Sequence, residues 1–167
     1  MGPGSGLTMP VEIVQERPDS PEATELIEEL DALLDVLYPV GSRHGFSVDR
    51  LLAESVDFFV LRVDGRPAAC GGLLVVGAGG GAELYGEIKR MYVRPEFRGA
   101  GYGKAIVDRL EDRARERGVG VLRLETGIHQ VEAIGLYERT GFRRIAPFGP
   151  YVDDPLSRCY EKRLADA

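Results

Sequence analysis

Arg98-Gly99-Ala100-Gly101-Tyr102-Gly103 connects an expected strand, Leu84 to Val93, to an expected helix, Gly101 to Arg117. Glycines at this place let the backbone turn tightly. The unpaired N–H groups at the helix start then point outward, together with the positive end of the helix dipole. The hexapeptide therefore predicts a cradle for an anionic ligand.

Basic residues gather around this turn, whereas the chain as a whole is acidic. Its 167 residues include 21 Lys and Arg against 27 Asp and Glu, a formal net charge of −6. A solvated face around a tight turn explains the local charge alone, but a polyphosphate ligand explains both the charge and the glycines. Between positions 89 and 104 a single acid, Glu96, stands against five basic residues: Lys89, Arg90, Arg94, Arg98 and Lys104.

Length and composition exclude several classes of protein. With 44% hydrophobic and 29% charged residues, the chain is expected to form one soluble globular domain. No apolar run approaches the roughly 20 residues that cross a bilayer. The acidic balance also argues against a nucleic-acid-binding module. We therefore expect neither a membrane nor a nucleic acid as partner.

The N-terminus and the cysteines indicate a cytoplasmic protein without a metal site. Residues 1–8 resemble a disordered cloning scar, so the single domain is expected to span residues 9–167. No basic region precedes an apolar segment there, as a signal peptide would require, which predicts a cytoplasmic location. Cys70 and Cys159 are far apart, form no CxxC and have no His cluster nearby. We expect them in the core, with neither a zinc site nor a disulfide.

Hydrophobic periodicity and turn residues predict an α+β order of elements. A helix that Ser20 and Pro21 open and Pro39 ends comes first, followed by an antiparallel meander of three strands. The second half alternates helix and strand, with a parallel segment where helices cross over. The expected strands are 11–14, 58–63, 68–76, 84–93, 119–125, 142–146 and 157–164, and the later expected helices are 48–53, 101–117 and 131–139.

Two other glycine-rich segments resemble nucleotide-binding motifs, but the residues around them do not fit those motifs. Gly77 to Ala82 fits the loose dinucleotide pattern G-x-G-x-x-G/A, but a strand follows where that pattern requires a helix. We interpret it as a hairpin loop, and a Rossmann-type oxidoreductase is the least favoured class. A P-loop is excluded because Ala105 follows Lys104 in place of the Ser or Thr that binds magnesium.

The hexapeptide and a second motif resemble the GNAT superfamily of acetyl-CoA-dependent acyltransferases. Arg98, Gly101 and Gly103 match Q/R-x-x-G-x-G/A, placed after a strand and at the opening of a helix. The run Ala133-Ile-Gly-Leu136-Tyr137-Glu138, which continues into Gly141-Phe142, matches a helix that carries Ala-x-x-Leu-Tyr-Glu. The resemblance covers about residues 11–164. It implies a three-layer fold, with a mixed, mostly antiparallel central sheet of six to seven strands and about four helices on its two faces.

The resemblance implies a binding site for acetyl-CoA. Gln130 stands where many relatives carry Asn, so its contact with the cofactor stays open. The pantetheine arm is expected to pair as an added strand with backbone groups of Met91 and Val93, on either side of Tyr92. The pyrophosphate is expected on the amides of Gly99, Ala100, Gly101, Tyr102 and Gly103, with charge from Arg98 and Lys104.

The resemblance also implies two catalytic residues, Glu87 and Tyr137. An amine of pKa about 10 is protonated at neutral pH, so a base must take a proton before the amine attacks. Glu87 is expected to be that base, directly or through water; the alternative is a solvent-facing strand carboxylate. Tyr137 is expected to give a proton or hydrogen bond to the departing sulfur, and the alternative is a core tyrosine. A backbone amide near Met91 is expected to polarise the acetyl carbonyl.

The acceptor is the part of the site that the sequence describes least. We predict acetylation of a primary amine of a small molecule, for example an amino acid or a derivative, or of a peptide or protein. The aromatic segment 147–155 fits a lid over a small substrate. Arg43, His44 and Lys89 are expected to hold a carboxylate, and Asp153 or Asp154 an ammonium, although each also fits an ordinary loop charge. The candidates are Arg43, His44, Lys89, Tyr151 and Asp153.

A second class of function stays open. A catalytically silent sensor that binds acetyl-CoA to regulate a partner protein would carry the same cradle. Only the two expected catalytic residues, Glu87 and Tyr137, favour an enzyme over this alternative. The resemblance leaves a homodimer open, and two histidines in unrelated contexts imply no metal.

Overall fold

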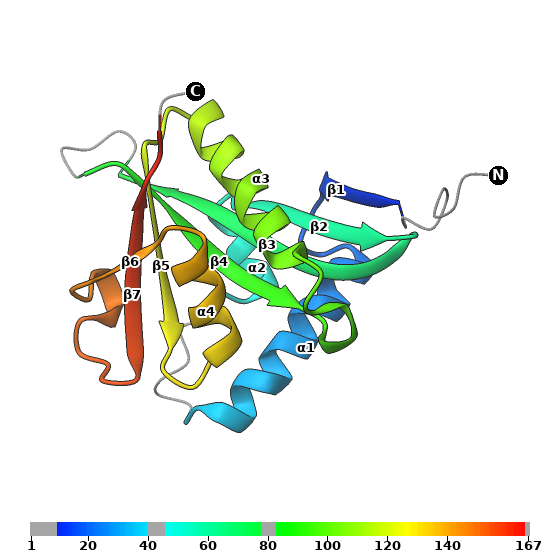
Figure 1. Ribbon diagram of the computed structural model, residues 1–167, viewed down its shortest axis with the longest axis horizontal. Coiled ribbons are helices and arrows are strands. Elements are labelled where there is room, and N and C mark those ends of the chain that lie inside the picture. Colours follow the sequence, from blue (N-terminus) through cyan, green and yellow to red (C-terminus); the bar gives the residue numbers. More distant parts are fainter. Residues whose placement is uncertain (1–9, 40–45, 78–82, 166–167) are drawn as a thin grey trace.

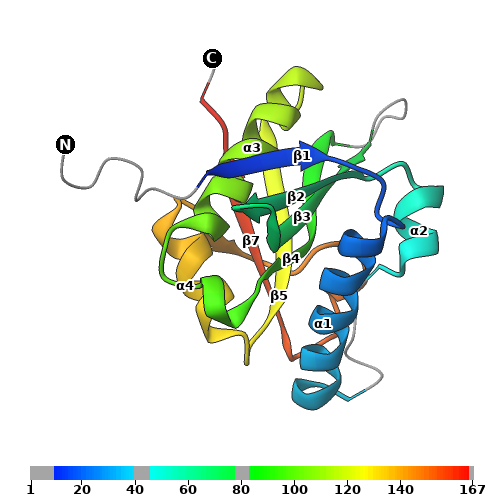
Figure 2. The same cartoon turned by 90° about the vertical axis from the view of Figure 1, so that its right-hand side faces the viewer.

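The computed structural model describes residues 10–39, 46–77 and 83–165. Over these ranges a seven-stranded sheet lies between two layers of helices (Figures 1 and 2). The expected α+β class, the number of strands and the helices on both faces are confirmed. Among the described helices, none is both long enough and apolar enough to cross a membrane.

The strands follow the order β1-β2-β3-β4-β5-β7-β6 across the sheet. Neighbours are antiparallel except β4 and β5, which are parallel. Asp64 and Gly65, both at positive φ, form the predicted tight turn between β2 and β3. The strands are β1 (Val11–Gln15), β2 (Asp57–Val63), β3 (Arg66–Val76), β4 (Tyr85–Val93), β5 (Val121–Gly127), β6 (Arg143–Ile145) and β7 (Ser157–Arg163).

Local capping signals position the helices. The Ser20 hydroxyl accepts a hydrogen bond from the Ala23 amide at 3.2 Å, which starts the first helix where the sequence predicts it. Gly101 has a left-handed φ of 85°, so it caps the third helix and is not its first residue. The helices are α1 (Pro21–Leu37), α2 (Val48–Ala53), α3 (Tyr102–Glu116) and α4 (Val131–Arg139), with short 3-10 turns η2 (Pro95–Phe97) and η3 (Gly149–Tyr151).

The sheet divides the core into two clusters. Phe58 and Val60 of β2 pack with α1 and α2, whereas Phe59 and Leu61 pack with α3. This alternation follows the two-residue period of a strand. Figure 2 shows α1 and α2 on one side of the sheet and α3 and α4 on the other. Each fully buried side chain of this size contributes roughly 1.5–3 kcal/mol relative to exposure.

The parallel strands β4 and β5 separate soon after they meet. They pair at Gly86 with Leu122 and at Glu87 with Arg123, although β4 continues to Val93. Figure 1 shows the two strands diverging from this point. Within the described residues, the edge of β4 that faces β5 therefore has no strand partner beyond Glu87.

A β-bulge on β4 places two cations next to each other. The β3–β4 register shifts between Cys70 and Gly72, and Arg90 has a positive φ of 57°. Arg90 reaches Asp31 on α1, while the Lys89 ammonium lies 4.0 Å from the centre of the Phe46 ring, on the same side. The bulge thus interrupts the strand alternation and puts Lys89 and Arg90 on one face of the sheet.

Candidate functional site

A cavity of about 780 Å³ opens where β4 and β5 have separated. Its walls come from the end of β4, the turn at residues 98–103, helix α4 and the apolar side of α1. An apolar cavity with a cationic end fits an elongated ligand that has an anionic head and an apolar arm. The lining includes Leu33, Leu37, Met91, Val93, Phe97, Arg98, Tyr102, Lys104 and Leu136.

The glycine turn has the conformation that the sequence predicts. Gly99 and Gly101 have φ values of 87° and 85°, which residues with a Cβ seldom adopt. Gly103 serves close packing, because a Cβ there would lie 3.0 Å from Cδ2 of Leu136. These glycines line the cavity, whereas Ala100 lines a separate hollow.

The basic residues around the turn are largely neutralised, which corrects the prediction that their charge is available to a polyanion. Arg98 has the longest ion pair of the five, 4.0 Å from Nη1 to Glu132. It is therefore the cation best placed to meet an anion at the α3 amides. The others have closer partners: Arg90 with Asp31, Arg94 with Glu25 and Glu29, Lys89 with Glu87 at 2.8 Å, and Lys104 with Asp108 at 2.8 Å.

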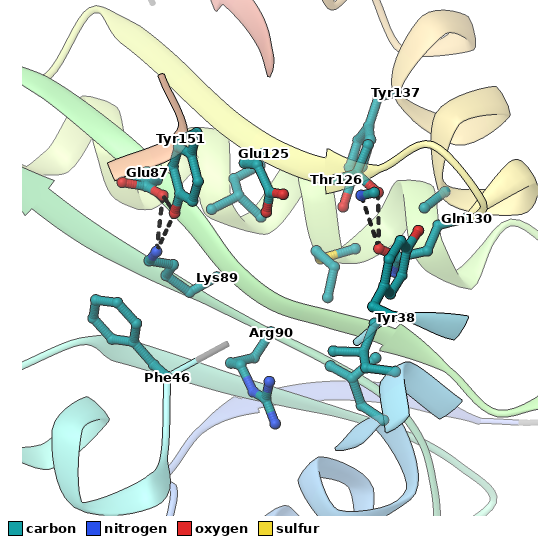
Figure 3. A pocket seen from close by; sticks show the side chains of 16 residues that line it. Tyr38, Phe46, Glu87, Lys89, Arg90, Glu125, Thr126, Gln130, Tyr137 and Tyr151 are labelled. Carbon is teal, nitrogen blue, oxygen red and sulfur yellow. Dashed lines mark hydrogen bonds and ion pairs between the residues drawn. The ribbon is translucent and has the colours of Figure 1, made fainter. Parts of the chain in front are cut away.

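A second pocket of about 80 Å³ adjoins the large cavity. Charged and aromatic side chains from β4, β5, α1, Phe46 and η3 line it (Figure 3). The two cavities meet along a shared wall. Five residues line both of them: Leu30, Met91, Gln130, Ala133 and Tyr137.

Glu87, Lys89 and Tyr151 form a buried cluster in the small pocket (Figure 3). Lys89 Nζ lies 2.8 Å from Oε2 of Glu87 and donates to the Tyr151 hydroxyl at 2.7 Å. That hydroxyl donates to the same Oε2 at 2.6 Å. Because Glu87 is only 5% exposed, the alternative of a solvent-facing carboxylate is wrong. Burial, together with the Glu87 carboxylate, raises the pKa of Tyr151, so its phenol stays protonated at neutral pH.

Tyr137 lies where the two cavities meet. It is 4% exposed, and its ring packs edge to face against Phe142 with centroids 5.7 Å apart. Burial, with a further contribution from the Glu125 carboxylate, raises the pKa of Tyr137. The phenol therefore keeps its proton throughout the neutral range and is a hydrogen-bond or proton donor.

Glu125 of β5 is a second carboxylate of the small pocket, which the sequence reasoning did not select. The Ser157 hydroxyl donates to its Oε2 at 2.6 Å. Figure 3 shows the Glu125 carboxylate between the Glu87 cluster and Tyr137. The only sign of it in the sequence is that Arg123 and Glu125 alternate with apolar residues in the expected strand 119–125. That alternation predicts a polar face but not that this face meets Glu87.

The end of α1 is tied to the connection between β5 and α4. The Tyr38 hydroxyl accepts a hydrogen bond from the His129 backbone N–H at 3.0 Å. Oε1 of Gln130 accepts bonds from the Gly127 amide at 3.0 Å and from the Thr126 hydroxyl at 3.3 Å. Gln130 thus borders both cavities while its side chain braces its own loop.

Replacing Gly127 with Ala is expected to disturb this contact. A Cβ at position 127 would lie 1.9 Å from the Tyr38 hydroxyl oxygen and 2.1 Å from its Cζ, so the buried ring must move. Overpacking of this kind costs about 1–3 kcal/mol, or roughly 2–12 °C in thermal midpoint for a chain of this size. Gly120→Ala is the control, because a Cβ there meets nothing within 4 Å. Equal thermal midpoints for the two variants would contradict the tight fit.

The remaining predicted residues lie in other places. Arg43 and His44 lie outside the described residues. Asp153 is exposed after η3 and is not brought into either cavity. The Tyr92 side chain points to α1, where its hydroxyl donates to Glu29 at 3.2 Å.

The described residues contain neither a disulfide nor a group of side chains that could hold a metal. Cys70 and Cys159 are buried free thiols, as predicted, and burial raises the pKa of Cys70 to about 12. No group of three His, Cys, Asp or Glu residues that could hold a metal occurs in residues 10–39, 46–77 and 83–165.

Sequence comparison identifies related proteins. The model of the acetyltransferase (GNAT) family matches residues 20–142. An IAA acetyltransferase of Azospirillum brasilense is 42% identical over 154 residues, which are 92% of this chain and 98% of that protein.

Solved structures share the architecture. The structure of a Klebsiella pneumoniae protein assigned to the acyl-CoA N-acyltransferases has a TM-score of 0.76 and 35% identity, and the match covers 93% of this chain and 98% of that one. An N-acetylglutamate synthase of Neisseria gonorrhoeae, complexed with coenzyme A and N-acetyl-glutamate, has a TM-score of 0.70 and 23% identity. The second match covers 93% of this chain and 35% of that one, and it shows the fold alone.

Proposed function

The chain belongs to the acetyltransferase (GNAT) family, and we propose that it moves an acetyl group from acetyl-CoA directly to the primary amine of a small molecule. The enzymes of this family are acyltransferases that use acetyl-CoA. The observation that carries the proposal is the meeting of two cavities at Met91 and Tyr137, one long and apolar and the other small and charged. Amino acids and their derivatives are the first candidates for the acceptor.

The residues of the large cavity fit coenzyme A. When bound, acetyl-CoA supplies an activated acyl carbonyl and a thiolate leaving group. Arg98 and the amides that open α3 bind its pyrophosphate, because a helix N-terminus attracts anions. Met91 and Val93 offer backbone groups to the pantetheine arm along the edge of β4, which has no strand partner there among the described residues.

Replacing Arg98 with Gln is expected to raise the KM for acetyl-CoA by roughly 10- to 100-fold with little change in kcat. A hydrogen bond to a charged group contributes about 1.5–3 kcal/mol, and a loss of uniform binding raises KM alone. Lys104→Gln is the matched control, because the Lys104 ammonium already pairs with Asp108. Steady-state kinetics compare the two variants, and a larger effect at Lys104 would overturn the assignment of Arg98.

Glu87 is the proposed general base. The acceptor amine, with a pKa of about 10, must lose a proton before it attacks. Glu87 lines the small pocket, and Lys89 and Tyr151 orient its Oε2. It takes the proton directly or through a water molecule.

Tyr137 is the proposed general acid. Its phenol lies at the junction of the cavities and is protonated at neutral pH. It donates its proton, or a hydrogen bond, to the sulfur that leaves. The backbone N–H near Met91 polarises the acyl carbonyl in the manner of an oxyanion hole.

A small acceptor is favoured over a protein by the size of the pocket. Its volume is about 80 Å³, and buried Phe46 and Tyr151 belong to its lining. A peptide chain would need an open groove at this place. Amino acids are small amines of this kind and are the first compounds to test.

A screen of acceptors tests the proposed function. The purified protein is incubated with acetyl-CoA and a panel of free amines, amino acids, peptides and lysine-containing proteins, and the release of free coenzyme A is measured. We expect turnover with small amines. Activity confined to peptide N-termini or protein lysines would contradict the proposal, and acetyl-CoA binding without any turnover would favour the silent sensor.

A further inference from the structure

We propose that Lys89 binds a carboxylate of the acceptor and exchanges its ion pair with Glu87 for one with the substrate. The inference rests on the proposed function, in which Glu87 takes the acceptor's proton. It names the substrate class: compounds that carry a primary amine and a carboxylate within the reach of one small pocket. Lys89 is then a specificity-determining residue.

Three groups surround the Lys89 ammonium. An ammonium has three N–H groups, and Nζ has three close neighbours: Oε2 of Glu87 at 2.8 Å, the Tyr151 hydroxyl at 2.7 Å, and the Phe46 ring at 4.0 Å from its centre. A substrate carboxylate that binds this ammonium can take the place of the Glu87 carboxylate. The flexible four-carbon stem of lysine permits that exchange without movement of the strand.

Charge balance in a buried pocket selects a zwitterion for this exchange. Glu87 and Lys89 are 5% and 7% exposed, so their charges are compensated mainly by each other. A molecule with one ammonium and one carboxylate separates the pair but gives each member a new partner of opposite sign. An amine without a carboxylate brings an additional positive charge next to Lys89. It offers no negative group to compensate the repulsion between the two cations.

Arg90 is a second buried cation beside Lys89. The β-bulge puts it beside Lys89 on one face of the sheet, and it lines the same pocket. Its Nη2 bonds to Asp31 and to the carbonyl of Ile27, but its buried Nε has no hydrogen-bond partner among the described residues. A buried donor without a partner is unfavourable. A carboxylate bound by Lys89 brings a further negative charge near this guanidinium, which already pairs with Asp31.

The exchange also affects the base. Oε2 of Glu87 accepts a hydrogen bond from the Tyr151 hydroxyl and forms an ion pair with the Lys89 ammonium. When Lys89 turns to the substrate carboxylate, its place beside the Glu87 carboxylate becomes available to the substrate ammonium. Binding of the correct substrate therefore prepares Glu87 to take the proton.

The test compares two acceptors that differ only in the carboxylate. The best amino acid from the acceptor screen and the amine that lacks only its carboxylate are each assayed for kcat/KM with wild-type enzyme, Lys89→Met and Lys89→Arg. Lys162→Met is the matched control, because Lys162 also pairs with a buried glutamate, Glu111 at 2.7 Å, away from both cavities. Thermal unfolding of every variant verifies that it folds.

We expect wild-type enzyme to prefer the amino acid by about 10- to 100-fold. Lys89→Met is expected to lose this preference through a higher KM for the amino acid, with the KM for acetyl-CoA unchanged, while Lys89→Arg and Lys162→Met keep it. A structural role of Lys89 would lower both rates together and leave their ratio intact, and that result overturns the inference.

The wild-type ratio decides the matter even if Lys89→Met does not fold. Equal kcat/KM values for the two acceptors in wild-type enzyme overturn the role of Lys89 and leave the proposed function standing. An enzyme that acetylates no small amine contradicts the proposed function and this inference with it.

Discussion

Tyr137→Phe is expected to lower kcat by roughly 100- to 10,000-fold while leaving the KM for acetyl-CoA nearly unchanged. A positioned general acid contributes a rate factor of this size. The phenol is kept protonated by its raised pKa, and the ring keeps its packing against Phe142 when the hydroxyl is removed. Steady-state kinetics at saturating acceptor separate the two constants.

Tyr160→Phe is the control for this variant. Tyr160 is 1% exposed and its hydroxyl donates to Glu138 at 3.1 Å, but it lines neither cavity. Loss of the Tyr160 hydroxyl is expected to lower the free energy of unfolding and to leave kcat close to the wild-type value. Equal turnover by Tyr137→Phe and wild-type enzyme would remove Tyr137 from the mechanism.

Glu87→Gln is expected to lower kcat/KM for the acceptor by roughly 100- to 10,000-fold. Glutamine has the same shape and can still accept the hydrogen bond from Tyr151, so the loss reports the missing charge. A base acts only when deprotonated, so the wild-type rate falls as the pH falls. The variant is expected to lack this part of the pH dependence, and pH–rate profiles of both enzymes measure it.

Glu111→Gln separates catalysis from stability in this experiment. Glu111 is a buried glutamate paired with Lys162, so its replacement also leaves a lysine without its counter-charge. Removing one partner of a buried pair costs about 3–5 kcal/mol, which thermal unfolding detects in either variant. If Glu87→Gln keeps the wild-type pH profile, the proton goes to another group, and Glu125 is the next carboxylate in the pocket.

Local signals were sufficient to predict the order of helices and strands, whereas the layers and the central sheet were implied by the resemblance to the GNAT superfamily. Ser20 before Pro21, the turn at Asp64 and Gly65, and the glycines from Gly99 to Gly103 each act on backbone within a few residues. Their conformations in the structure agree with the prediction. The expected strand at 142–146 is shorter, 143–145, because strand ends depend on pairing with a neighbour and not on local preference.

The charge around the cradle could not be predicted from its own segment. The carboxylates that neutralise Arg90 and Arg94 lie on α1, about 60 residues earlier in the chain. Counting charges along the sequence finds the basic segment but not its partners. Arg98 stands out only when the ion pairs of all five residues are compared.

The acceptor pocket depends even more on tertiary structure. Tyr151 and Glu87 are 64 residues apart in sequence, and their contact requires β4, β5 and η3 to come together. The sequence selected both residues, together with Lys89, but for separate roles. Their meeting in one cluster, with Glu125 beside it, follows from the sheet topology and from the position of η3.

A crystal structure with acetyl-CoA tests the central assignment most directly, because it locates the sulfur and the acyl carbonyl relative to both cavities. We predict the pyrophosphate on the α3 amides beside Arg98, the sulfur within hydrogen-bond distance of the Tyr137 hydroxyl, and the acetyl group facing Glu87 from the mouth of the small pocket. A sulfur beyond the reach of Tyr137, with the acetyl group directed away from Glu87, would contradict this prediction.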